Sequence, residues 1–216
     1  VSSQKEILDL LSKIHEKISG IKIGLQYITQ SSPEDIKELS KFNKPIFYDG
    51  KFFDIKNTLV ASIKSLQKLK ISYATVHLLN GLDSLKAANE VADRIGIKLL
   101  GVSVLTSFNN DELQHLGFRD QVQEQVSRLI KIASEANLYG VICSPHEVKM
   151  IKKITPRLKC FTPGIRQDEK KDDQKRTMNA KQALIEGSDC LIIGRPITEG
   201  NPKENIQKIL STINEI

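Results

Sequence analysis

The feature that most limits the fold of this chain is an alternation of short strand-like runs with amphipathic helical stretches. Seven runs are apolar or alternate between apolar and polar residues, as β-strands do. They are Ile21–Leu25, Pro45–Lys51, Thr75–Leu79, Leu99–Leu105, Gly140–Cys143, Leu158–Thr162 and Cys190–Gly194. The stretches with helical periodicity between and after them are Leu59–Leu69, Gly81–Ile95, Gln121–Ala136, Pro145–Lys153, Asn179–Glu186 and Pro202–Ile213. Such alternation predicts parallel strands joined by right-handed helical crossovers, and therefore an α/β domain.

The number of strands and the start of the chain favour one α/β architecture over the other. An opening helix precedes the first strand, with Ser3 and Glu6 as a capping box. At 216 residues, we expect one domain over residues 1–216. A doubly wound sheet and a (β/α)8 barrel both fit this length. Seven strands after a helix favour a (β/α)8 TIM-type barrel whose first strand is apparently absent from this chain, its place being just before Val1.

Composition excludes several classes of protein. Hydrophobic residues make up 39% and charged residues 27%, and no apolar run approaches the length of a membrane span. The three cysteines cannot form an even-numbered disulfide framework, so a reducing cytoplasm is the simplest location. The net charge of +6 favours anionic partners, either nucleic acid or phosphorylated metabolites.

Four charged side chains stand at predicted strand ends. Asp49 and Lys51 are two residues apart on one strand and therefore share a face. Asp54 follows in the loop, and Lys22 interrupts an apolar run, where a charge is costly unless it is paired or faces a polar cavity. We expect the four to converge at one site. The alternative is a solvated edge or a structural ion pair.

Other strand ends carry further polar candidates. Thr106 follows one strand, Arg166 ends a Thr-Pro-Gly-Ile-Arg loop, and Gly194 and Arg195 follow the last strand. In (β/α)8 enzymes, the last two loops commonly bind phosphate through backbone N–H groups and a cation. Arg195 next to Gly194 offers both kinds of donor.

These residues belong to three longer sequence blocks. The blocks are Asp49-x-Lys51-x-x-Asp54-Ile55-x-Asn57-Thr58, Thr162-Pro-Gly-Ile-Arg166 with Asp173-Gln174-x-Arg176, and Gly194-Arg195-Pro196-Ile197-Thr198. With them the chain closely resembles the orotidine 5'-phosphate decarboxylase family, from near Val1 to the last helix. The Asp-x-Lys-x-x-Asp part is shared with sugar-phosphate relatives such as hexulose-phosphate synthase. The Asp-Ile-x-Asn-Thr extension and the Thr-Pro-Gly-Ile-Arg block are more diagnostic of the decarboxylase.

The resemblance implies a reaction and roles for the charged residues. The reaction is conversion of orotidylate to uridylate and CO2, the last step of de novo pyrimidine synthesis, without metal or organic cofactor. Lys51 would stabilise the carbanion at pyrimidine C6 and donate a proton to it, and Asp49 would lie against the substrate carboxylate. Lys22 and Asp54 would complete the charged network.

The resemblance also implies substrate contacts and a partner. In this family Asp54, Ile55 and Thr58 reach the neighbouring subunit's site, which implies a homodimer. By the same matching, Lys22 and Asp49 also contact substrate, Thr106 contacts the pyrimidine edge, and the phosphate is held by four residues: Arg166, Gln174, Gly194 and Arg195. The polar run of residues 167–175 would be a lid, although as an isolated pattern it is also typical of a solvated loop. The missing first strand would carry an Asp that binds ribose.

Two rival functions stay open at this stage, and three residues near strand ends are expected to have structural roles. A sugar-phosphate enzyme of the same suprafamily would need Mg²⁺. A nucleic-acid-binding protein fits the net charge, but aromatic residues are only 5% and no recognition signature occurs. His77 is expected to be packed rather than catalytic, Cys143 to be a core residue, and Ser144 to be a helix cap before a proline. The histidines and cysteines lack metal-ligand spacing, so no metal is predicted.

Overall fold

Seven parallel strands form one curled sheet that follows the order of the sequence. The computed structural model describes residues 3–166 and 177–214. The strands are β1 (Ile21–Gly24), β2 (Ile46–Phe52), β3 (Tyr73–His77), β4 (Lys98–Val102), β5 (Gly140–Ile142), β6 (Lys159–Thr162) and β7 (Cys190–Leu191). Each strand pairs in parallel with the next. The predicted α/β class and the seven parallel strands are thereby confirmed.

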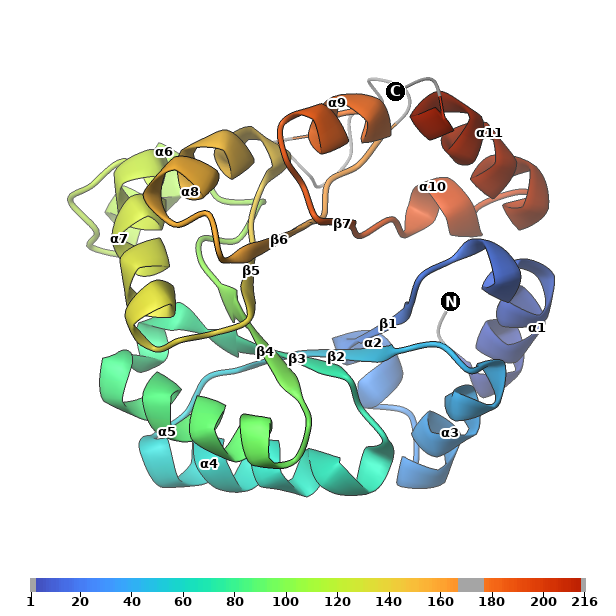
Figure 1. The fold of residues 1–216 in the computed structure, drawn as a ribbon, viewed down its shortest axis with the longest axis horizontal. Helices are drawn as coiled ribbons and strands as arrows, with labels where there is room; N and C mark the ends of the chain where they lie inside the picture. Colours follow the sequence, from blue (N-terminus) through green and yellow to red (C-terminus); the bar gives the residue numbers. More distant parts are fainter. Residues whose placement is uncertain (1–2, 167–176, 215–216) are drawn as a thin grey trace.

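Helices surround the outer face of this sheet, as Figure 1 shows. They are α1 (Gln4–Ile14), α2 (Leu25–Ile28), α3 (Pro33–Glu38), α4 (Lys56–Ser65), α5 (Leu82–Arg94), α6 (Asn110–His115), α7 (Val122–Glu135), α8 (Val148–Ile154), α9 (Ala180–Ile185), α10 (Arg195–Thr198) and α11 (Pro202–Asn214). Short 3-10 turns add η1 (His15–Lys17), η2 (Leu39–Phe42), η3 (Leu66–Leu69), η4 (Leu78–Asn80) and η5 (Pro145–Glu147). The predicted capping box of the opening helix is present, because the Ser3 hydroxyl accepts from the Glu6 N–H and the Glu6 carboxylate accepts from the Ser3 N–H.

Side chains alternate between two packed regions, one on each face of the sheet. On β4, Leu99 belongs to the large core between sheet and helices, whereas Leu100 belongs to a cluster on the inner face. This inner cluster contains the rings of Phe47 and Phe161, whose centroids lie 6.1 Å apart in an edge-to-face arrangement. Phe47 lies two residues before Asp49 on β2. The apolar aromatic cluster therefore lies on the amino-terminal side of the polar strand ends.

The sheet is open between β1 and β7. Among the described residues no strand lies between these two edges, which face each other across an opening in Figure 1. A cavity of about 1090 Å³ occupies this region, and its lining is rich in apolar side chains of α1, β1, α11 and the segment after β7. The arrangement is that of a (β/α)8 barrel opened at one position.

Several predicted boundaries differ from the structure. The strand predicted at Thr75–Leu79 begins at Tyr73 and ends at His77, because the chain turns into η4. The strands predicted to end at Leu105 and Gly194 stop at Val102 and Leu191, where the chain leaves the parallel ladder. The four shortest helices outside the predicted stretches have too few residues to show a periodic pattern: α2, α3, α6 and α10.

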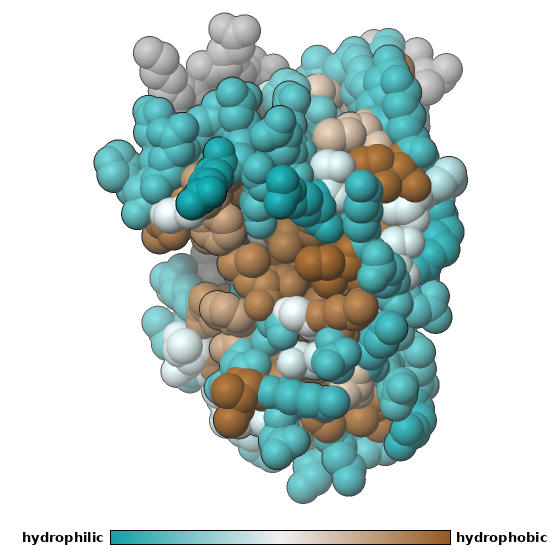
Figure 2. Space-filling model, turned by 90° about the vertical axis from the view of Figure 1, so that its left-hand side faces the viewer, coloured by the Kyte–Doolittle hydropathy of each residue, from teal (hydrophilic) through white to brown (hydrophobic). Residues whose placement is uncertain are grey.

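The surface is mostly hydrophilic, in keeping with the high content of charged residues. On the face shown in Figure 2, hydrophilic side chains cover the upper and lower parts, and apolar side chains gather between them. Across residues 3–166 and 177–214, every helix is too short or too polar to cross a membrane.

Candidate active site

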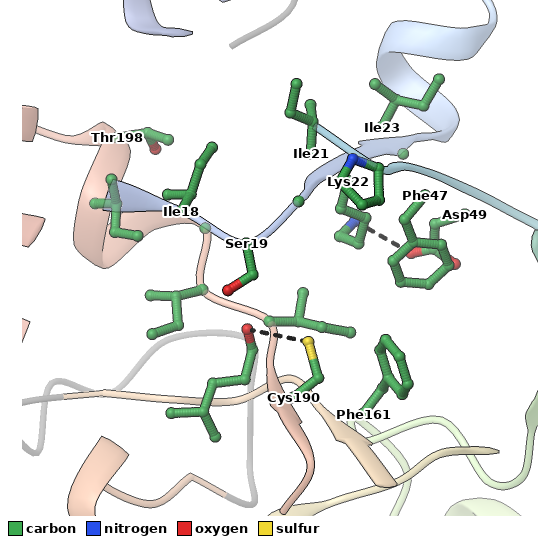
Figure 3. A pocket seen from close by; sticks show the side chains of 18 of the residues that line it. Ile18, Ser19, Ile21, Lys22, Ile23, Phe47, Asp49, Phe161, Cys190 and Thr198 are labelled. Carbon is green, nitrogen blue, oxygen red and sulfur yellow. Dashed lines mark hydrogen bonds and ion pairs between the residues drawn. The ribbon is translucent and has the colours of Figure 1, made fainter. Parts of the chain in front are cut away.

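Three of the four predicted charged residues meet at the carboxyl ends of β1 and β2. Lys22 Nζ lies 3.1 Å from Asp49 Oδ2, and Lys51 Nζ lies 2.9 Å from Asp49 Oδ1. Figure 3 shows Lys22 reaching from β1 to Asp49 on β2. The carboxylate of Asp49 is therefore held between two ammonium groups. The expectation that Asp49 and Lys51 point the same way, and that Lys22 is paired, agrees with this geometry.

Asp49 is 8% exposed and stays ionised at neutral pH. Burial acts to raise its pKa, but the attraction and hydrogen bonds of Lys22 and Lys51 overcome burial, so the pKa lies below its ordinary value of 3.8. Because the folded-state pKa is depressed, the stability gained from these ion pairs is present above that ordinary value. It is lost only as the pH falls through the lower folded value.

The backbone that carries Asp49 and Lys51 is irregular. Lys51 has φ of 48°, in the left-handed region, and the β2–β3 register shifts between Tyr48 and Phe52. The stacked rings of Tyr48 and Phe52 lie 5.7 Å apart, and a Cβ at Gly50 would come within 2.8 Å of the Tyr48 ring. The glycine between the two charged residues therefore leaves room for this stack.

A residue that the sequence patterns did not reveal supports the irregular segment. The hydroxyl of Thr75 on β3 accepts a hydrogen bond from the Lys51 backbone N–H at 2.8 Å and donates one to Asp49 Oδ1 at 3.0 Å. Thr75 is fully buried. Threonine is common in strands because of its β-propensity, so its presence on β3 gives no functional signal. Its role would be predictable only from the pairing register that places it opposite Asp49.

A cavity of about 290 Å³ extends from the charged cluster across the strand ends. Its lining includes seven of the predicted site residues: Lys22, Asp49, Lys51, Thr106, Arg166, Gly194 and Arg195. Four of these side chains are cationic and one is a carboxylate, so the cavity favours a small anionic molecule. The rest of the lining is largely apolar, with Val102, Val104, Leu105, Ile142, Pro163 and Ile192.

Asp54, Ile55 and Thr58 lie apart from this cavity. They are exposed in the loop after β2 and the first turn of α4, and neither cavity described above includes them in its lining. Asp54 Oδ1 accepts from the Ile55 N–H at 2.7 Å. The Asp54 N–H donates to Asn80 Oδ1 at 3.1 Å, and Asn80 Nδ2 donates to the carbonyl of Phe52 at 2.9 Å. Within one chain, the fourth charge therefore does not join the other three.

The remaining histidine and cysteine candidates have packing roles. His77 Nδ1 accepts from the Leu79 N–H at 3.3 Å, and burial, together with the charge of Lys51, lowers its pKa. Cys143 is fully buried in the core, and the Ser144 hydroxyl caps η5 by accepting from the His146 N–H. In the described part of the chain, no group of three or more potential ligands is arranged to hold a metal ion. Gln174 and the predicted lid lie outside the described residues.

One family of known proteins matches nearly the whole chain. The model of the "Orotidine 5'-phosphate decarboxylase / HUMPS family" matches residues 1–209. The chain belongs to this family. The resemblance found in the three sequence blocks is thereby confirmed, and it extends over nearly the full length.

Relatives in the decarboxylase family cover almost all of the chain. An orotidine 5'-phosphate decarboxylase of Legionella pneumophila (strain Lens) is 40% identical over 214 residues, which are 96% of this chain and 93% of the relative. That of a Wolbachia pipientis strain from Culex pipiens is 36% identical over 212 residues, 97% of this chain and 94% of the relative.

A solved structure confirms the type of fold. The crystal structure of orotidine 5'-phosphate decarboxylase from Lactobacillus acidophilus matches with a TM-score of 0.85 and 32% identity, covering 99% of this chain and 96% of that one. The open seven-stranded sheet is therefore a TIM-type α/β fold of the decarboxylase family.

Proposed function

We propose that this chain decarboxylates orotidine 5'-phosphate to uridine 5'-phosphate, the last step of de novo pyrimidine synthesis. The observation that carries the proposal is the buried Asp49 carboxylate between Lys22 and Lys51, inside a cavity that favours an anion. The family match and the names of the relatives support the choice of substrate.

The three clustered charges suit the electronic demand of this reaction. When the bond between C6 and the carboxylate breaks, CO2 leaves and the electron pair stays on C6. The ammonium of Lys51 stabilises that pair and then transfers a proton to C6, and the neutral amine regains a proton from solvent. Asp49 lies against the substrate carboxylate, and the repulsion between the two falls as CO2 departs. Lys22 keeps Asp49 and Lys51 oriented.

Other residues of the cavity lining suit the phosphate and the pyrimidine edge. Arg195, Arg166 and the backbone N–H of Gly194 would grip the phosphate, with Gln174 from outside the described residues. Thr106 would contact the pyrimidine. The net positive lining would neutralise the dianionic phosphate.

We also propose that two copies of the chain share their sites. Ile55 is 74% exposed and Phe53 is 62% exposed, although both are large apolar residues next to Asp54. Exposed apolar side chains around a motif residue support an interface there. Asp54, Ile55 and Thr58 would then complete the cavity of the second copy, with Asp54 as the fourth member of its charged network.

The remaining proposals concern the barrel and the surroundings of the enzyme. An eighth parallel strand between β1 and β7 would close the sheet, and the large cavity there supports this. We propose a cytoplasmic enzyme that needs no metal or organic cofactor and has neither nucleic acid nor membrane as a partner.

Turnover in the presence of a chelator tests the function. We expect the ultraviolet absorbance of orotidine 5'-phosphate to fall with time when the enzyme is added in EDTA, at the same rate as without EDTA. The roles given to Lys51 and Asp49 require no Lewis acid. A purified chain that leaves the absorbance unchanged, yet acts on a ketohexulose phosphate with added Mg²⁺, would favour the sugar-phosphate alternative.

Replacement of Arg195 by alanine tests the phosphate end of the cavity. We expect KM for the nucleotide to rise by about 100-fold, because charge-assisted hydrogen bonds to phosphate are lost. Weak binding of uridine, which has no phosphate, should be unchanged. Lys203→Ala, at an exposed position on the following helix, is the matched control. An Arg195 variant with the KM of the parent protein would contradict the assignment.

A further inference from the structure

Thr75 lies on β3 opposite the point where the pairing of β2 and β3 shifts its register. Tyr48 pairs with Ala74, and Phe52 pairs with Val76. The three residues of β2 between these pairs, Asp49 to Lys51, therefore stand opposite the single residue Thr75. Such a bulge removes backbone groups from their usual ladder partners and redirects side chains.

The Thr75 side chain takes over two tasks that the bulge creates. Its hydroxyl accepts from the backbone N–H of Lys51, a residue whose left-handed backbone is uncommon outside glycine. The same hydroxyl donates to Asp49 Oδ1, which also binds Lys51 Nζ. The hydroxyl proton is therefore directed to the carboxylate, because the oxygen is already the acceptor for the Lys51 N–H.

We infer that Thr75 is a positioning residue, whose hydroxyl fixes the relative placement of the Asp49 carboxylate and the Lys51 ammonium for the decarboxylation. This inference rests on the proposed function. It goes beyond that function because Thr75 lies outside the lining of the cavity at the charged cluster and acts only through its two neighbours. The Thr75 side chain is fully buried. In a variant without the hydroxyl, a water molecule could take its place only if the substitution opened a cavity large enough to hold that water.

A series of substitutions separates the hydroxyl from the packing of the side chain. Thr75→Val keeps the shape and removes the hydroxyl, whereas Thr75→Ser keeps the hydroxyl and removes a methyl group. We expect kcat of Thr75→Val to fall by about 10- to 100-fold, because small displacements of reacting groups have effects of this size. KM and the Kd for uridine 5'-phosphate should change by less than about threefold, since Thr75 does not touch the nucleotide, and Thr75→Ser should keep most of the parental kcat.

A second pair of variants covers the case in which valine prevents folding. Thr75→Ala and Thr75→Ser both lack the methyl group of threonine and differ from each other only in the hydroxyl. A lower kcat for Thr75→Ala than for Thr75→Ser therefore still measures the effect of the hydroxyl alone. Thr155→Val is the matched control, because Thr155 is also buried but its hydroxyl bonds Ser134.

Each outcome distinguishes this inference from the proposed function. A valine variant with parental kcat, or a serine variant as slow as the alanine variant, would overturn the positioning role while the parent enzyme stays active. A parent protein without turnover would overturn the proposed function itself, and the positioning role with it.

Discussion

Lys51→Ala is expected to lower kcat by about 10,000-fold, the largest effect of any single substitution in this chain. Two contributions disappear together: the cation that stabilises the carbanion at C6 and the acid that donates the proton to it. A loss of this size corresponds to about 5.5 kcal/mol of transition-state stabilisation. Stopped ultraviolet assays at high enzyme concentration would measure it.

Binding should largely survive the loss of Lys51. Lys22 still contacts Asp49 at 3.1 Å, and the proposed phosphate contacts Arg166 and Arg195 follow β6 and β7, away from β2 in the sequence. The Kd for uridine 5'-phosphate should therefore change by less than about tenfold. Lys64→Ala on the exposed face of α4 is the control and should keep the parental kcat. If Lys51→Ala retained more than about a tenth of the turnover, another group would have to donate the proton.

Mixing Lys51→Ala with Asp54→Ala subunits is expected to restore activity from nearly none to about a quarter of the parental value. In a twofold symmetric pair with shared sites, one site of the mixed dimer lacks both groups and the other has both. Random exchange at equal amounts gives about half mixed dimers, each with one complete site of two, hence about a quarter of all sites.

The mixing experiment needs an exchange step and one matched control. The two variants are unfolded and refolded together, and the turnover is compared with that of each variant refolded alone. Asp83→Ala, on the first turn of α5, replaces Asp54→Ala in the control mixture. This mixture should give about half of the parental activity, because half of the chains carry Lys51 and every chain carries Asp54. Two inactive variants that stay inactive after joint refolding would show that Asp54 serves its own chain.

Much of the site could be predicted because its charged residues stand out locally in the sequence, close to one another or among apolar neighbours. Asp49 and Lys51 are two residues apart on a strand, and the regular alternation of side chains predicts that they share a face. Lys22 was noticeable as a charge among apolar neighbours, and its ion pair with Asp49 explains how the strand tolerates it. The residues after the strands, Thr106 and Arg195 among them, were predicted because parallel strands place their carboxyl ends at one edge.

Other parts depended on contacts between segments that are distant in the sequence. Thr75 bonds Asp49 across 26 residues, and the bulge that makes this contact needed the shifted register of β2 and β3. The separation of Asp54 from the other charges also arose in three dimensions, since its backbone is tied to Asn80 and its side chain to the adjacent backbone. Short spacings cannot encode such geometry, because it results from the way two strands are aligned.

The amino-acid sequence by itself determined the class of fold, the order of the strands and the edge at which the charges gather. These properties follow from local periodicity, because each strand or helix must turn its apolar side to the core. Only the tertiary structure decided that Thr75 lies opposite Asp49 and Lys51 and that Asp54 points away from them. The physical reason is that these features depend on which segments the folded chain brings into contact. That contact sets the pairing register of the strands, the left-handed backbone of Lys51 and the burial of the Thr75 hydroxyl.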